Sequence, residues 1–208
     1  MVKTIEEPQN ARSRRTCSAL LAATRELLEE QGFEALTMAA VAKRAGVSRR
    51  AVYLHFASRA ELLTALFGYL GQSEDIAGSL RRVWEAPDAA AALQEWAWHL
   101  ARIHPRIIAV SRAVDRVRRS DPEAAAFWER SMSNWYAGCR RLVAWLEQEN
   151  RLAPPWTADT AADMLWALMS FDVLERLLVD RRWSPERYAE HLALLFRSTF
   201  VHDPAPSN

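Results

Sequence analysis

The chain has 208 residues and a net charge of +1; half of its residues are hydrophobic and a quarter are charged. This composition is ordinary for a folded globular protein and argues against a disordered one. No apolar run approaches the roughly 18 residues that a membrane span requires, and the polar residues 1–10 are unlike a signal peptide. We therefore expect a cytoplasmic protein that does not engage a membrane.

The charge is distributed unevenly along the chain. Residues 1–60 hold ten Lys and Arg against six Glu, whereas the remainder holds seventeen basic against twenty acidic residues. A basic first quarter suits local contact with a polyanion. Cys17 and Cys139 lie far apart with no His or Cys at a ligand spacing, which predicts reduced thiols and no metal site.

The pattern of apolar residues, Pro and Gly predicts an all-α chain of about nine helices, since alternating β-branched runs are absent. We expect the first helix from Arg12 to Gln31. Ser58-Arg59-Ala60-Glu61 is a capping box and opens a long helix that we expect to reach Trp84 and to connect two domains.

Prolines mark the later helix boundaries. Pro87, Pro122 and Pro185 each stand beside a capping residue, which is typical of a helix start. Pro154-Pro155 is expected to close the helix that begins near Pro122. His104-Pro105 predicts a break or kink between two helices, because a residue before proline avoids the α region.

Residues 37–56 have the spacing of a helix-turn-helix. Thr37 and Ser48 are the expected N-caps of its two helices, and Gly46 can adopt the positive φ that the tight turn requires. Arg49 and Arg50 occupy the first turn of the second helix, where an arginine can read guanine through two hydrogen bonds. The alternative is that both are solvated residues of a basic face.

The same segment carries a larger set of characteristic positions: Leu36-Thr37, Ala42, Ala45-Gly46-Val47-Ser48, Val52-Tyr53, His55-Phe56, Ser58 and Glu61-Leu62. They resemble the signature of the TetR family of repressors, over residues 12 to about 67. The resemblance implies a three-helix DNA-binding domain at residues 1–57 and a helical ligand-binding and dimerisation domain at residues 58–208.

The resemblance also implies roles for individual side chains at the DNA. Tyr53 and His55 would contact phosphate or base, and Arg59, where relatives usually have lysine, would hold a phosphate. Tyr53 could equally pack between helices, because tyrosine does both. With the two caps and the two arginines, the predicted DNA-binding set is Thr37, Ser48, Arg49, Arg50, Tyr53, His55 and Arg59.

All nine tryptophans follow residue 80, at positions 84, 96, 98, 128, 135, 145, 156, 166 and 183. Indole rings in helices can line a cavity for a flat apolar ligand, although each is individually more typical of a core. By similarity to the family, the predicted lining of an effector site is Trp96, His99, Ile103, Trp128, Met132, Trp135 and Trp166.

Residues 160–179 are apolar nearly all round, which predicts a helix covered on more than one side. This eighth helix and a ninth, with Tyr188, Leu192, Leu195, Phe196 and Phe200 on its apolar face, would pair with a second copy of themselves. A two-fold homodimer of this kind matches a pseudo-palindromic operator in double-stranded DNA.

An enzyme is not indicated, because the chain lacks a Gly-x-Ser-x-Gly motif, a His-Glu-x-x-His motif, a phosphate-binding glycine loop and recognisable paired carboxylates. No cofactor is expected. An architectural DNA-binding protein without a ligand is the alternative, and the tryptophan-rich domain argues against it. The sequence therefore predicts a regulator, by family habit a repressor, that a small apolar or aromatic molecule releases from DNA.

Overall fold

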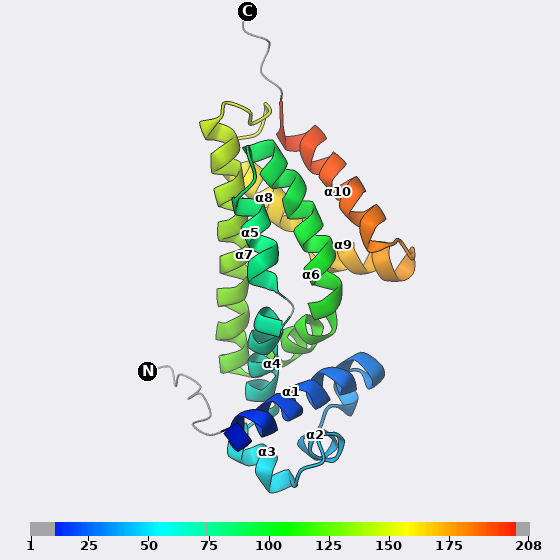
Figure 1. Ribbon diagram of the computed structural model, residues 1–208. Coiled ribbons are helices and arrows are strands. Elements are labelled where there is room, and N and C mark those ends of the chain that lie inside the picture. The colour runs from blue at the N-terminus through cyan, green and yellow to red at the C-terminus, as the bar shows by residue number, and fades with distance from the viewer. Residues whose placement is uncertain (1–10, 74, 203–208) are drawn as a thin grey trace, which may run out of the picture. The chain divides into compact units, whose positions relative to one another are not determined.

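A computed structural model describes residues 11–73 and 75–202. The polar first ten residues discussed above lie outside this part of the chain. The regular elements of the described residues are helical, and the prediction of an all-α chain is confirmed (Figure 1). They are α1 (Ala11–Gln31), η1 (Phe33–Ala35), α2 (Met38–Arg44), α3 (Arg49–His55), α4 (Arg59–Ser73), α5 (Ile76–Trp84), α6 (Ala89–Val117), α7 (Pro122–Gln148), α8 (Ala158–Leu168), α9 (Phe171–Glu175), η2 (Arg176–Asp180) and α10 (Pro185–Phe200).

The chain divides into two compact units. One holds the described part of residues 1–71 together with Ala109–Trp128, and the other holds the described part of Gln72–Ile108 and of Glu129–Asn208. The division passes through α6 and α7, so each of these long helices contributes residues to both units.

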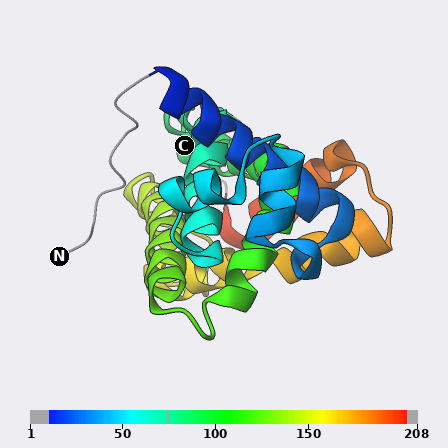
Figure 2. The ribbon, with the colours of Figure 1, turned by 90° about the horizontal axis from the view of Figure 1, so that it is seen from below.

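In the first unit, α1, α2 and α3 pack together, as the view from below shows (Figure 2). The core of this unit contains the apolar side chains of Leu20, Leu27, Val41 and Val52. Burial of such side chains is the main stabilising contribution to a small helical domain.

Helix starts are confirmed wherever a capping residue marks them. The carboxylates of Asp88 and Asp121 accept hydrogen bonds from the backbone N–H groups of Ala91 (2.7 Å) and Ala124 (2.9 Å) at the starts of α6 and α7. Ser184 caps α10, with Pro185 in its first turn. These bonds satisfy N–H groups that have no partner within their own helix.

The prediction of one long helix from Ser58 to Trp84 is wrong. Helix α4 ends at Ser73 and α5 begins at Ile76, because Asp75 adopts a left-handed conformation (φ 51°) and its carboxylate accepts a hydrogen bond from the N–H of Gly78 (3.1 Å). Asp tolerates this conformation better than most residues. The segment therefore is not one continuous helix. Helices α6 and α7, which contribute residues to both units, are longer than α4 and α5.

Three further boundaries differ from prediction. Helix α6 continues through Pro105 without a break, although proline cannot donate the hydrogen bond that its position calls for. The expected helix over 160–179 is divided. Helix α8 ends at Leu168, and Ser170 caps the next helix, α9, by accepting a hydrogen bond from the N–H of Val173 (3.4 Å). Helix α7 ends at Gln148, ahead of the two prolines, since Asn150 has a φ of 55°.

Candidate nucleic-acid interface and effector site

The caps and turn of the helix-turn-helix form as predicted. The hydroxyl of Thr37 accepts a hydrogen bond from the N–H of Ala40 (3.1 Å), and that of Ser48 accepts one from the N–H of Ala51 (3.2 Å). Gly46 has a φ of 67°, which a residue with a Cβ would adopt only with strain. Thr37 and Ser48 thereby fix where α2 and α3 begin.

Helix α3 turns its predicted readers outward. Val52 is fully buried, whereas Arg49, Arg50 and Tyr53 are exposed. Arg49 donates a hydrogen bond from Nη2 to the hydroxyl of Tyr53 (3.4 Å), and its guanidinium carbon lies 5.7 Å from the centre of that ring. His55 is half-buried beside Phe56. The structure therefore brings Arg49, Arg50 and Tyr53 onto one solvent-facing surface.

Arg59, at the start of α4, is half-buried. Its guanidinium lies 4.2 Å from the centre of the Phe33 ring and donates a hydrogen bond to the carbonyl of Leu36 (3.3 Å). Stacking on an aromatic ring is a stabilising use of arginine that lysine fulfils less well. Arg59 thus holds the loop before α2, whatever else it contacts.

Arg44, on the outer face of α2, is also engaged within the protein. It bonds both Glu26 (3.1 Å) and Glu30 (2.8 Å) of α1. The hydrogen bond to Glu30 raises the pKa of Arg44 and lowers the pKa of Glu30. Arg44 thereby joins α2 to α1.

Leu54 is a candidate functional residue that was not predicted from the sequence. This residue of α3 is 78% exposed, more than any other large apolar side chain in the described part of the chain. The helical pattern could have identified it, because Leu54 lies two positions after the buried Val52, and two positions correspond to about 200° around a helix.

In the second unit, Trp96 and His99 of the predicted effector site lie together. Their rings are stacked with centres 5.3 Å apart, and the indole N–H of Trp96 donates to the sulfur of Met169 (3.2 Å). Gly138 makes room for the indole, since a Cβ at that position would lie 2.9 Å from it. Burial, followed by the charge of Arg102, lowers the pKa of His99 to about 4, and its Nδ1 lies 2.9 Å from the hydroxyl of Ser79.

Trp135 belongs to a neighbouring ring cluster with His104 and Phe171. The imidazole of His104 is stacked on Trp135 at 4.9 Å and lies 5.4 Å from Phe171. His104 is fully enclosed, and its Nδ1 has no hydrogen-bond partner among the described residues. Burial, with a smaller effect of His99, lowers the pKa of His104 to about 3.

The other predicted lining residues are more scattered. Ile103 is buried and Met132 half-buried, whereas Trp166 is 40% exposed and stands edge-on to Tyr136. Trp128 lies in the other compact unit, where the guanidinium of Arg118 is 5.0 Å from its ring centre. The structure groups Trp96 with His99, and Trp135 with His104, but not the whole set.

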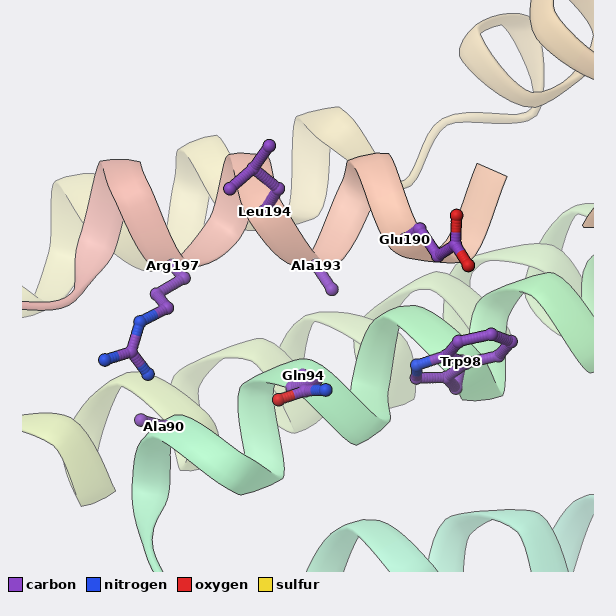
Figure 3. Close-up of a pocket in the computed structure, with 7 residues that line it drawn as sticks. All are labelled: Ala90, Gln94, Trp98, Glu190, Ala193, Leu194 and Arg197. Atoms are coloured by element: carbon purple, nitrogen blue, oxygen red, sulfur yellow. The ribbon is translucent and has the colours of Figure 1, made fainter. Parts of the chain in front are cut away.

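A groove of about 270 Å³ lies between α6 and α10 (Figure 3). Its walls contain none of the predicted lining residues. They consist of small side chains, one indole and both signs of charge: Ala90, Gln94, Trp98, Glu190, Ala193, Leu194 and Arg197. Four of the seven are exposed, so the groove is open to solvent.

Comparison with known proteins identifies the family that the helix-turn-helix segment resembles. Residues 20–66 match the family model of bacterial regulatory proteins, tetR family. The resemblance to this family that the sequence predicts is confirmed for residues 20–66.

A curated relative in this class is the HTH-type transcriptional regulator EthR of Mycolicibacterium smegmatis. The two sequences are 31% identical over 141 residues, which cover 66% of this chain and 63% of the relative. The chain thus spans less than two thirds of the length of that protein.

Solved structures share the fold. A putative transcriptional regulator from Saccharomonospora viridis, in complex with choline, has a TM-score of 0.74 at 16% identity and covers 90% of this chain and 98% of its own. The transcriptional regulator FadR from Bacillus subtilis, in complex with stearoyl-CoA, has a TM-score of 0.69 at 19% identity and covers 89% of this chain and 99% of its own.

Two other kinds of site are absent from the described residues. Within residues 11–73 and 75–202, no helix combines the length and apolar character needed to cross a membrane. In the same ranges, no three or more His, Cys, Asp or Glu side chains are grouped so as to hold a metal ion.

Proposed function

We propose that the protein is a sequence-specific DNA-binding regulator, a repressor that a small molecule releases from its operator in the cytoplasm. The observation that carries the proposal is the outward face of α3, where Arg49, Arg50 and Tyr53 are exposed on a helix-turn-helix of the TetR family. A helix can enter the major groove, and arginine pairs with guanine there. Residues 1–57 would bind DNA and residues 58–208 the effector and a second copy.

Substitution of the two arginines tests DNA readout. Arg49→Ala and Arg50→Ala should each weaken binding to a selected operator by about 1 to 3 kcal/mol and relax the preference at one base position of each half-site. Binding is measured by fluorescence anisotropy on a duplex that the wild-type chain has selected from a random library. Arg82→Ala, at an exposed arginine of α5, is the matched control and should bind as the wild type does.

Arg59→Ala should behave differently from these two variants. Loss of a phosphate contact would weaken binding to all sequences alike, and loss of the Phe33 contact would also lower the free energy of unfolding. If Arg49→Ala and Arg50→Ala keep the base preference and salt dependence of the wild type, α3 does not read the operator through them.

The effector site is proposed to centre on the two ring clusters of the second unit, at Trp96–His99 and Trp135–His104. Clustered aromatic rings with few polar atoms suit a flat or chain-like apolar ligand, and ring faces also attract a cationic group. The fold neighbours with choline and stearoyl-CoA supply two probes of different chemistry.

Tryptophan fluorescence titration with choline and with stearoyl-CoA tests the site, alongside anisotropy of the operator complex. A ligand that binds better to the DNA-free state lowers operator affinity by its affinity ratio for the two states, typically about 5- to 150-fold. Trp135→Ala should weaken the ligand and leave operator affinity without ligand unchanged. Trp183→Ala is the control, because the Trp183 ring contacts His191 (5.0 Å between ring centres) and belongs to neither ring cluster. Equal sensitivity in both variants would place the site elsewhere.

We propose that the dimer forms through α8 and α10, which correspond to the first part of the predicted eighth helix and to the ninth. Supporting residues are the exposed large apolar side chains on these two helices: Met164, Trp166, Leu194 and Leu195. A symmetric pair of such surfaces would present two copies of α3 to half-sites about 34 to 36 Å apart.

A further inference from the structure

The outermost line of α3 carries an apolar side chain beside an arginine. Arg50 and Leu54 are each two residues from the buried Val52, and both are exposed. Two residues turn an α-helix by about 200°, so Arg50 and Leu54 lie on the side opposite the core contact. They are four residues apart and therefore neighbours on that side.

Scattered exposed leucines are ordinary on protein surfaces. Val179 and Leu194 are the other strongly exposed apolar residues. Leu54 differs from them because it lies on the outward side of α3, the second helix of the helix-turn-helix. A leucine cannot bond a phosphate or a polar base edge. In the major groove, the C5-methyl group of thymine is the apolar feature that such a side chain can contact.

We propose that Leu54 is a specificity-determining residue that contacts a thymine methyl group in the operator. This inference rests on the proposed DNA-binding function and assigns part of its target. Four residues along a helix span about 6 Å, and successive base pairs lie about 3.4 Å apart. The thymine should therefore lie about two base pairs from the guanine that Arg50 contacts, on either strand.

The test removes one methyl group from the DNA. The wild-type chain selects a duplex from a random library, and each thymine of one half-site is then replaced by deoxyuridine, one at a time. Wild-type protein should bind about threefold to tenfold more weakly to the duplex that lacks the contacted methyl group. Leu54→Ala should bind the thymine and deoxyuridine duplexes equally, because it no longer reaches the methyl group.

Two further variants make the comparison specific. Leu54→Met keeps an apolar side chain of similar reach and should retain the preference for thymine. Val179→Ala, an exposed apolar substitution in the second unit, should behave as the wild type. All variants should show wild-type helical circular dichroism, because Leu54 contributes little to the core.

The outcomes separate the two levels of the proposal. Selection that enriches no sequence overturns the proposed function and this inference with it. Enrichment followed by equal binding to every deoxyuridine duplex overturns the inference alone, and so does a preference for thymine that persists in Leu54→Ala.

Discussion

A buried imidazole costs free energy when it is protonated, and α6 contains two, His99 and His104. Their pKa values in the folded protein are about 4 and about 3, below the value near 6.5 of an unfolded chain. Between these values the unfolded state binds more protons. The stabilisation that the neutral rings provide is therefore complete above about pH 6.5 and is lost as the pH falls toward 4 and 3.

We predict that the free energy of unfolding falls by about 2 kcal/mol for each buried histidine between pH 7 and pH 5. His104→Phe should reduce this loss by about half, because phenylalanine fits a ring cluster and does not titrate. Urea unfolding at pH 7, 6 and 5 measures it. Trp135→Phe is the matched control in the same cluster. It should lower the free energy of unfolding at every pH and leave its dependence on pH unchanged. A His104→Phe protein with the full slope would contradict the assignment.

Single residues could be predicted from the sequence where their role is local. Thr37, Ser48 and Ser184 are caps in the structure because the bond that each makes is to a backbone group three residues away. The pairing of Trp96 with Met169 could not be predicted in this way. This contact joins residues 73 positions apart, and only the folded chain brings them together.

At the scale of the element, helix starts that follow a recognised capping residue could be predicted, whereas breaks inside a continuous helical pattern could not. A start is marked by a side chain that satisfies free N–H groups, whereas the breaks before α5 and α9 lie within stretches of continuous helical pattern. Asp75 and Ser170 cap from inside such stretches. Pro105 is the opposite case, because a residue that usually ends a helix lies inside α6, whose flanking residues Ile103 and Ile107 are buried. Tertiary packing there outweighs the local preference.

The continuity of α6 leads to a prediction for Pro105→Ala. Proline inside a helix costs about 3 kcal/mol relative to alanine, and the greater freedom of the unfolded alanine chain offsets about 0.4 to 1 kcal/mol of that. The substitution should therefore raise the free energy of unfolding by about 2 kcal/mol. Urea denaturation with an unchanged slope against denaturant measures it.

Pro185→Ala provides the control for this experiment. Pro185 lies in the first turn of α10, where proline suits the helix and its missing N–H is not required. Its replacement should change stability by less than about 1 kcal/mol. A Pro105→Ala protein no more stable than the wild type would mean that the surrounding side chains depend on the backbone geometry that the proline imposes.

At the scale of the molecule, the sequence predicted the all-α architecture and the resemblance of residues 20–66 to the TetR family, but not the surfaces of the second unit. Apolar residues in the predicted eighth and ninth helices looked alike in the sequence. In the structure Leu174 is fully buried, whereas Leu195 is 42% exposed. Which apolar residues remain for a second copy depends on how α8, α9 and α10 pack, and the helical period alone does not show this.

This difference gives the test of the dimer. Leu195→Arg places a charge on the exposed side of α10, where its aliphatic part can lie on the surface and its guanidinium can reach water, so the monomer should fold. In a symmetric interface the same substitution occurs on both sides and would bury two like charges without partners. We predict monomers at micromolar concentration by sedimentation velocity, with wild-type circular dichroism.

Leu174→Arg is the contrasting variant, because it forces a charge into the interior and should prevent folding instead of dissociating a folded dimer. The folded Leu195→Arg monomer carries one α3. It should therefore bind a duplex with two half-sites no more tightly than a duplex with one, while keeping the base preference that Arg49 and Arg50 provide. The wild-type dimer should bind the two-half-site duplex far more tightly, since its second contact is intramolecular. A Leu195→Arg protein that remains dimeric and keeps that advantage would move the interface away from this side of α10.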